Sequence, residues 1–85
     1  MSIRKKRVRQ IFRSQVFSRD EHKCLFCKSI SNLEAHHIEN RNKFEDGGYF
    51  LENGATLCPK HHLEAEKNEI TIEQIRRKIN EKSNQ

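Results

Sequence analysis

The feature that most constrains the fold is a set of four potential metal ligands arranged as two short pairs. Two residues separate Cys24 from Cys27, and two separate Cys58 from His61. Each pair can present both of its side chains to one ion. Three thiolates and one imidazole make a tetrahedral set typical of structural Zn²⁺. The sequence therefore predicts that the two pairs meet around one zinc ion.

The cysteine count favours a metal over disulfides. The chain has three cysteines, so a disulfide would leave one thiol over. Residues 28–57 separate the two pairs, far more than the insert of a C₂H₂ DNA-reading finger, so this insert must fold by itself. Zinc binding supplies ~10–16 kcal/mol in small metal domains, as much as the ~5–15 kcal/mol net stability of an ordinary domain. Removing zinc is therefore expected to unfold the protein.

Composition makes such a metal useful. The chain has 85 residues, of which 33% are hydrophobic, and has no Trp, so we expect one domain, residues 1–85, with a thin core. Neither an apolar run of membrane-spanning length nor a signal-peptide pattern follows Met1. We expect a soluble, cytoplasmic protein without a membrane partner.

Apolar spacing and breaker residues predict an α+β domain. A basic arm (1–7) comes first, and Val8, Ile11, Phe12 and Val16 then share one helical face. Gly47-Gly48 lies in a loop between two predicted strands, which we expect to pair as a hairpin. The expected elements are a helix over about 8–20, strands over 33–38 and 55–58, a helix over 60–67 after Pro59, and a C-terminal helix over about 71–82 that Thr71 and Gln74 cap.

Basic residues gather near the N-terminus. The net charge is +5, which suits a polyanionic partner, with nucleic acid as the first candidate. Nuclear-localisation signals have a similar composition, so the cluster alone leaves both interpretations open. The candidate DNA-binding residues are Arg4, Lys5, Lys6, Arg7, Arg9 and Arg13.

Several motifs together resemble those of the HNH endonucleases. The run contains Cys24-x2-Cys27, Leu-Glu-Ala-His36-His37-Ile, Gly47-Gly48 and Asn53-Gly-Ala-Thr-Leu-Cys58-x2-His61-His62. The similarity is to the zinc-containing branch, covers about residues 8–67, and implies a ββα-metal fold in which a hairpin and a helix hold one divalent cation. Free-standing proteins of this size and type resemble phage or mobile-element nucleases, in which case the location would be the bacterial host cytoplasm.

The resemblance also implies roles for single residues. His37 matches the general base that takes a proton from water, and Asn53 matches the residue that orients this base by holding one imidazole nitrogen. His36 and His62 match the ligands of the catalytic cation, which would bind the scissile phosphate. In a regular strand, His36 and His37 would point to opposite faces, so one shared site requires a local bend or ligands on both sides of the phosphate.

Two departures leave the metal assignments open. Many relatives have Asp in place of His36 and Cys in place of His61. Two imidazole ligands suit Mn²⁺, Co²⁺, Ni²⁺ or Zn²⁺ better than Mg²⁺, so all five are candidates for the catalytic cation. His61 and His62 are adjacent and can exchange roles, although the spacing from Cys58 favours His61 as the zinc ligand.

These observations predict a metal-dependent endonuclease that nicks or cuts double-stranded DNA. The alternatives are a zinc-stabilised nucleic-acid-binding module without catalysis and a protein-interaction zinc domain. Neither alternative needs His37, Asn53 and His62 in addition to the zinc ligands. A domain this small either nicks with weak specificity or acts as a homodimer or with a partner such as packaging machinery.

Overall fold

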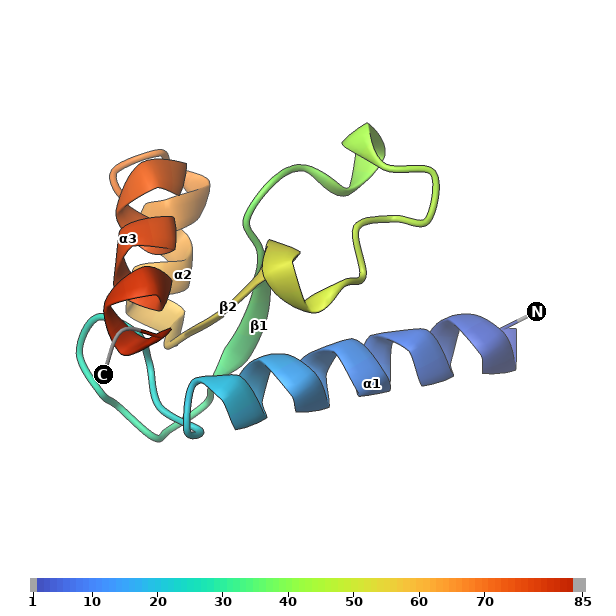
Figure 1. The fold of residues 1–85 in the computed structure, drawn as a ribbon, viewed down its shortest axis with the longest axis horizontal. Coiled ribbons are helices and arrows are strands. Elements are labelled where there is room, and N and C mark those ends of the chain that lie inside the picture. The colour runs from blue at the N-terminus through green and yellow to red at the C-terminus, as the bar shows by residue number, and fades with distance from the viewer. Residues whose placement is uncertain (1, 84–85) are drawn as a thin grey trace.

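The computed structural model describes the backbone of residues 2–83 and the side chains of residues 6–81. It confirms the predicted α+β architecture, with a two-stranded antiparallel hairpin and three α-helices among the described residues. In chain order these are α1 (Ser2–Arg19), β1 (Glu34–His37), β2 (Gly54–Leu57), α2 (Pro59–Glu66) and α3 (Ile72–Ser83). The long helix α1 runs along one flank of the hairpin (Figure 1), and α2 contacts both strands. Ala65 of α2 and Ile75 of α3 belong to the same buried cluster.

The first helix is longer than predicted. The separate basic arm was a wrong prediction for Ser2–Arg7, because α1 already begins at Ser2. Only the second half of its apolar face reaches the core: Phe12 and Val16 are buried, whereas Val8 and Ile11 are 39% and 51% exposed. The N-terminal half of α1 extends past the hairpin (Figure 1), so its apolar residues have no core to cover.

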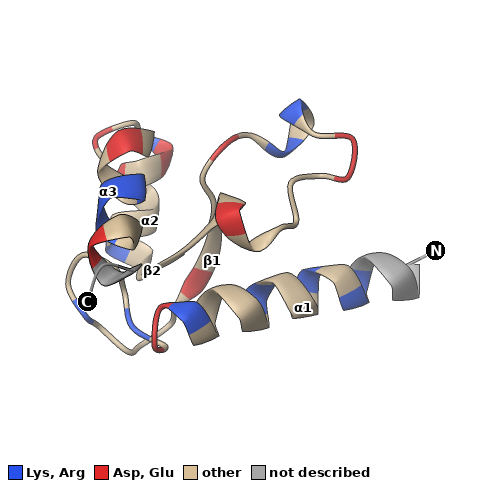
Figure 2. Ribbon diagram, viewed as in Figure 1, with Lys and Arg blue, Asp and Glu red and all other residues tan. Residues whose placement is uncertain are grey.

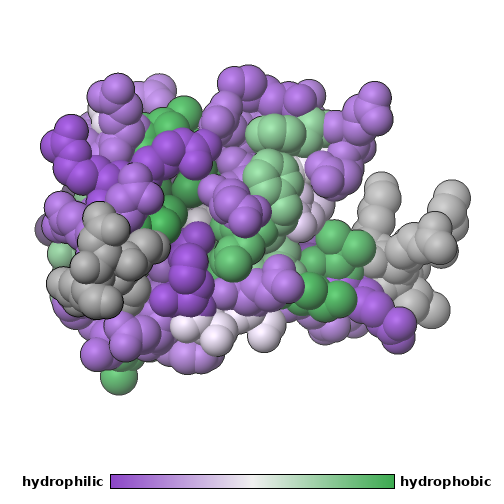
Figure 3. All heavy atoms as spheres, in the orientation of Figure 1, coloured by the Kyte–Doolittle hydropathy of each residue, from purple (hydrophilic) through white to green (hydrophobic). Residues whose placement is uncertain are grey.

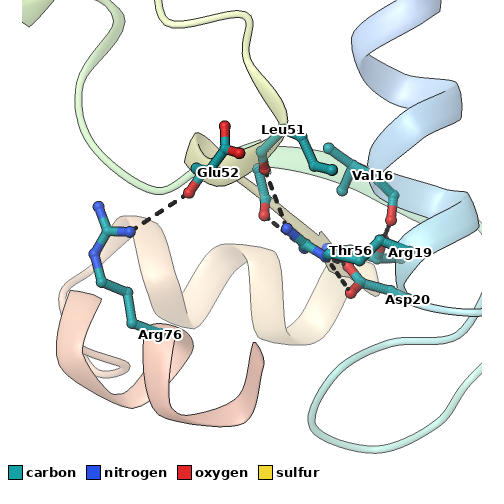
Figure 4. A network of polar contacts seen from close by, with 8 residues as sticks. Val16, Arg19, Asp20, Leu51, Glu52, Thr56 and Arg76 are labelled. Atoms are coloured by element: carbon teal, nitrogen blue, oxygen red, sulfur yellow. Dashed lines mark hydrogen bonds and ion pairs between the residues drawn. The ribbon is translucent and has the colours of Figure 1, made fainter. Parts of the chain in front are cut away.

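A buried ion pair fixes α1 to the hairpin (Figure 4). The Asp20 side chain is fully buried and accepts a hydrogen bond from the backbone N–H of Thr56 at 3.0 Å. Arg19 donates to both Asp20 oxygens at 2.8 Å, and to the carbonyls of Leu51 and Gly54 at 3.1 and 2.7 Å. A buried carboxylate is tolerated only with such partners, so these bonds set the position of β2 against α1.

The hairpin register places His37 opposite Gly54. The side chains of Phe12 and Val16 occupy the space that a Cβ at position 54 would need. Glycine here lets α1 approach β2 closely, and this approach brings Phe12 next to the strand that carries the paired histidines.

Both C-terminal helices begin as their sequences predict. Pro59 is the first residue of α2, where its missing N–H costs nothing. Before α3, the N–H of Gln74 donates to Thr71 Oγ1 at 3.1 Å and the N–H of Thr71 donates to Gln74 Oε1 at 2.7 Å, a reciprocal capping box. Ile75 is buried in the core, whereas Ile72 is 44% exposed, so only part of the apolar face of α3 packs against the core.

The core is small, and cysteines are part of it. Figure 3 shows a mostly hydrophilic face with apolar side chains in separate groups. None of the helices within residues 2–83 has the length and apolar character needed to span a membrane. The main cluster of buried residues is Cys24, Leu25, Ile38, Ala55, Leu57, Cys58, Ala65, Ile70 and Ile75.

Candidate functional site

Three cysteines and one histidine converge as predicted. The ligand atoms of Cys24, Cys27, Cys58 and His61 all lie within 4.8 Å of one another. The Sγ atoms of Cys27 and Cys58 are 3.6 Å apart, and His61 Nδ1 lies 3.6 Å from Cys24 Sγ and 3.2 Å from Cys58 Sγ. A tetrahedral Zn²⁺ site has S–S edges of about 3.8 Å and S–N edges of about 3.5 Å. The four residues, named here the Cys₃His cluster, therefore fit a metal such as zinc.

Local structure explains how the chain builds this cluster. The N–H of Cys24 donates to Ser29 O at 2.9 Å and the N–H of Lys28 donates to Cys24 O at 3.0 Å, which closes a tight turn around the first ligand pair. The Phe26 ring stacks on the His61 ring at 5.5 Å. Because His61 Nδ1 faces the thiols, His61 and not its neighbour belongs to the cluster.

His62 belongs to a second arrangement. Its ring meets the His36 ring edge to face, with centroids 5.1 Å apart. Glu34 Oε2 lies 2.9 Å from Nδ1, and Glu66 Oε2 lies 3.7 Å from Nε2. A carboxylate on one imidazole nitrogen is the usual way to aim the other at a metal. Among the described side chains, only the Cys₃His cluster brings three or more ligand atoms within 4.8 Å of one another, so His36 and His62 do not belong to a comparably tight group.

The environment keeps His36 neutral. Burial of the ring, together with the nearby His62, lowers the pKa of His36 from 6.5 to about 4. Metal ligation requires unprotonated imidazole. His36 is thus in the protonation state that a divalent cation needs at neutral pH.

His37 is held between aromatic rings. It stacks on Phe12 with centroids 4.7 Å apart and meets Tyr49 edge to face at 4.8 Å. Its Nε2 is buried and has no hydrogen-bond partner in the described part of the chain. Burial, with a smaller contribution from the positive charge of Arg41, lowers the pKa of His37. The ring is therefore neutral at pH 7 and can accept a proton.

One open cleft of about 1020 Å³ is lined by His36, His37 and His62. The lining includes six consecutive residues, 32–37. Because neighbouring residues of a strand point to opposite faces, this lining places the cleft along the free edge of β1. His36 and His37 thus reach one cleft from opposite faces of the strand. The charged side chains at the cleft are Arg9, Arg13, Glu34, Arg41 and Glu66, and Tyr49 also lines it.

Asn53 acts differently from the prediction. Its Oδ1 accepts the N–H of Glu39 at 2.9 Å, and its Nδ2 donates to the carbonyls of Gly48 and Glu39 at 3.1 and 3.3 Å. Both amide protons are used, so the predicted bond to the His37 ring is not formed. The amide is almost fully buried and joins the two ends of the loop that follows the histidine strand.

The basic residues predicted to bind DNA are divided in position. Arg9 and Arg13 line the cleft, and the Arg13 guanidinium lies 5.0 Å from the Phe17 ring centre. Lys6 and Arg7 are exposed and lie closer to the N-terminus of α1, whereas the side chains of Arg4 and Lys5 lie outside the described residues.

Two further cleft residues, Glu34 and Arg41, were not predicted. The signal for Glu34 was its place two residues before His36, on the same face of the strand. Arg41 lies in a loop where the sequence has no periodicity to place it.

Comparisons with family models, curated proteins and solved structures give no match for this chain.

Proposed function

We propose that the protein is a metal-dependent DNA endonuclease of the HNH type, with zinc in the Cys₃His cluster as a structural metal. The observation that carries this proposal is that His36, His37 and His62 share one open cleft with Arg9 and Arg13. Zinc binding alone requires none of these three histidines. A neutral base, a pair of imidazole ligands and cations for phosphate are the groups that phosphodiester hydrolysis needs.

In this proposal His37 takes the proton from the attacking water. Its pKa lies below the ordinary value because of burial and Arg41, so the unprotonated form predominates at neutral pH. Phe12 and Tyr49 support the ring on a face and an edge, which limits its rotation. General-base catalysis of this kind contributes about 10²–10⁴ in rate.

His36 and His62 would hold the catalytic cation. Their rings meet edge to face and Glu34 engages His62 Nδ1, so a metal would bind at His62 Nε2, where Glu66 Oε2 lies 3.7 Å away. A divalent cation bound there would stabilise negative charge on the phosphate and on the leaving oxygen. Two imidazoles suit Mn²⁺, Co²⁺, Ni²⁺ or Zn²⁺ better than Mg²⁺.

The proposed substrate is double-stranded DNA, bound mainly through its phosphates. Arg9 and Arg13 lie on the cleft side of α1, and Figure 2 shows Lys and Arg repeated along this helix. Contacts of this kind give salt-dependent affinity with little sequence selectivity.

Cleavage of supercoiled plasmid tests the proposal. The zinc-loaded protein is incubated with plasmid in Mg²⁺, Mn²⁺, Ni²⁺ or no added cation, beside His37→Ala and the matched control His22→Ala. His22 is an exposed histidine outside the cleft. We expect nicked or linear DNA from the wild type and from His22→Ala, and a loss of about 10²-fold or more for His37→Ala.

Two results would contradict the proposal. If His37→Ala cuts as fast as the wild type, His37 is not the base. If the wild type binds the plasmid but leaves it intact with every cation, the alternative applies: a zinc-stabilised nucleic-acid-binding module. The basic residues of α1 and the Cys₃His cluster would suffice for that function.

A further inference from the structure

Arg41 occupies a defined position at the rim of the cleft. It begins a short 3₁₀ helix, η1 (Arg41–Lys43), in the loop after β1. Asn40 caps this helix, because its Oδ1 accepts the N–H of Asn42 at 2.8 Å. The Arg41 guanidinium lies over the ring of Tyr49, 5.6 Å from its centre, and both residues line the cleft. The backbone cap and the aromatic ring therefore both restrict where the guanidinium can point.

Apart from its contact with the Tyr49 ring, the Arg41 guanidinium has no charged partner within ion-pair distance among the described side chains. Two residues further on, Lys43 is paired with Glu39 at 2.7 Å. A guanidinium that is held in place yet unpaired can bind an incoming anion without first breaking an internal bond.

Arg41 lies close to the proposed base. Tyr49, which supports Arg41, also touches His37 edge to face at 4.8 Å. The positive charge of Arg41 is one of the two causes that lower the pKa of His37, which agrees with this proximity. Arg9, from α1, lines both the cleft and an adjacent hollow of about 530 Å³, and so do Arg41 and Tyr49. Two arginines from distant parts of the chain thus face the same space.

We propose that Arg41 is a substrate-binding residue that holds a backbone phosphate of duplex DNA beside His37, with the Tyr49 ring as its support. A planar guanidinium can bind phosphate through two parallel hydrogen bonds while its face stays on an aromatic ring, and an ammonium group cannot do both. This inference rests on the proposed function for its substrate, but it concerns binding and not the chemical step.

The salt dependence of DNA binding tests this role directly. A short fluorescein-labelled DNA duplex is titrated with zinc-loaded protein, without added divalent cation, at several KCl concentrations, and affinity is read from fluorescence anisotropy. Arg41→Gln is compared with the wild type, with Arg41→Lys and with the matched control Lys43→Gln. Loss of one phosphate contact lowers the slope of log affinity against log salt by about 0.9.

We expect Arg41→Gln to bind several-fold more weakly with that smaller slope, and Lys43→Gln to match the wild type. Arg41→Lys keeps the charge but loses the paired hydrogen bonds, so it should bind more weakly at an unchanged slope. An Arg41→Gln variant with the wild-type slope would overturn the inference, and so would a wild-type protein that does not bind the duplex. If Arg41→Gln fails to fold by circular dichroism, Arg41→Lys decides, because wild-type affinity in that variant contradicts the proposed contact.

The outcome is separate from that of the nuclease proposal. A protein that binds duplex DNA through Arg41 but never cuts plasmid keeps this inference and loses the nuclease. A protein that cuts plasmid with an unchanged slope in Arg41→Gln keeps the nuclease and loses this inference.

Discussion

The molecule has two groups of metal-type ligands, and they are held in different ways. In the Cys₃His cluster three pairs of ligand atoms lie 3.2–3.6 Å apart, and two of the cysteines belong to the hydrophobic core. In the cleft, His37 is instead supported by Phe12 and Tyr49 and His62 by Glu34, and the His36 ring meets the His62 ring.

This difference separates folding from function. Three thiols and an imidazole packed against one another have little reason to stay together without an ion, so we expect the cluster to depend on a bound metal. The cleft histidines keep their places through stacking and a carboxylate contact. We therefore expect the two groups to respond in opposite ways to mutation and to metal removal.

The largest expected effect is on folding. Cys58→Ser should unfold the protein or leave it largely unfolded, because a structural zinc site of ~10–16 kcal/mol equals or exceeds the net stability of a small domain. His36→Ala should keep the fold. Circular dichroism and metal analysis check both variants, and we expect about one zinc per chain in the wild type and in His36→Ala. A folded, zinc-free wild type would remove the distinction between the two groups.

Asn53→Ala should cause the next largest loss of stability. Asn53 does not line the cleft; its side chain holds the backbone of the loop behind it. The substitution leaves the partly buried N–H of Glu39 and the carbonyl of Gly48 without their partner, and each such group costs about 1–3 kcal/mol when buried. Urea unfolding should show a loss of about 3 kcal/mol with zinc still bound. Asn42→Ala, at an exposed position in the same loop, should change stability by less than about 0.5 kcal/mol.

The pH dependence of stability tests the burial of His36, one of the cleft histidines. The folded-state pKa of His36 is about 4 against an ordinary 6.5, so between these values the unfolded chain binds more protons. The contribution of His36 is therefore fully present above pH 6.5 and is lost as pH falls toward 4. Melting temperatures of the wild type should drop more steeply over this window than those of His36→Gln. Protonation of the Cys₃His ligands affects the wild type and His36→Gln alike, so it cancels in the comparison. If the two curves of melting temperature against pH are parallel, the pKa of His36 is not lowered by burial.

The smallest effect is expected at the contact between α3 and the loop. Arg76 pairs with Glu39 at 2.8 Å, and Arg76 with Lys43 lowers the pKa of Glu39, with the Lys43 hydrogen bond as the larger cause. Exposed pairs of this kind contribute little to stability. Arg76→Gln should unfold in urea within error of the wild type, and a loss as large as that of Asn53→Ala would mean that α3 helps to hold the cleft.

The features that the sequence predicted correctly depend on residues only a few positions apart. Pro59 and the reciprocal cap of Thr71 and Gln74 are local signals. The convergence of Cys24 and Cys27 with Cys58 and His61 was predictable because only a joint site satisfies both pairs. The endonuclease activity itself stays a proposal.

The parts that sequence did not predict depend on contacts between distant segments. Asp20 bonds to Thr56, 36 positions away, and no spacing indicates such a partner. The start of α1 was misplaced because a basic segment has no apolar periodicity from which to read a helix. For Asn53, the family resemblance indicated importance, but only the loop geometry shows that its partners are backbone groups.

Tyr49 has a spectroscopic consequence. The chain has one Tyr and no Trp, so all intrinsic fluorescence above the phenylalanine range comes from the ring that touches both His37 and Arg41. Emission from a tyrosine depends on what lies against it, and this protein therefore has an unlabelled optical reporter next to its proposed base. Titration of His37, or the arrival of an anion at Arg41, can be followed by light in the unmodified chain.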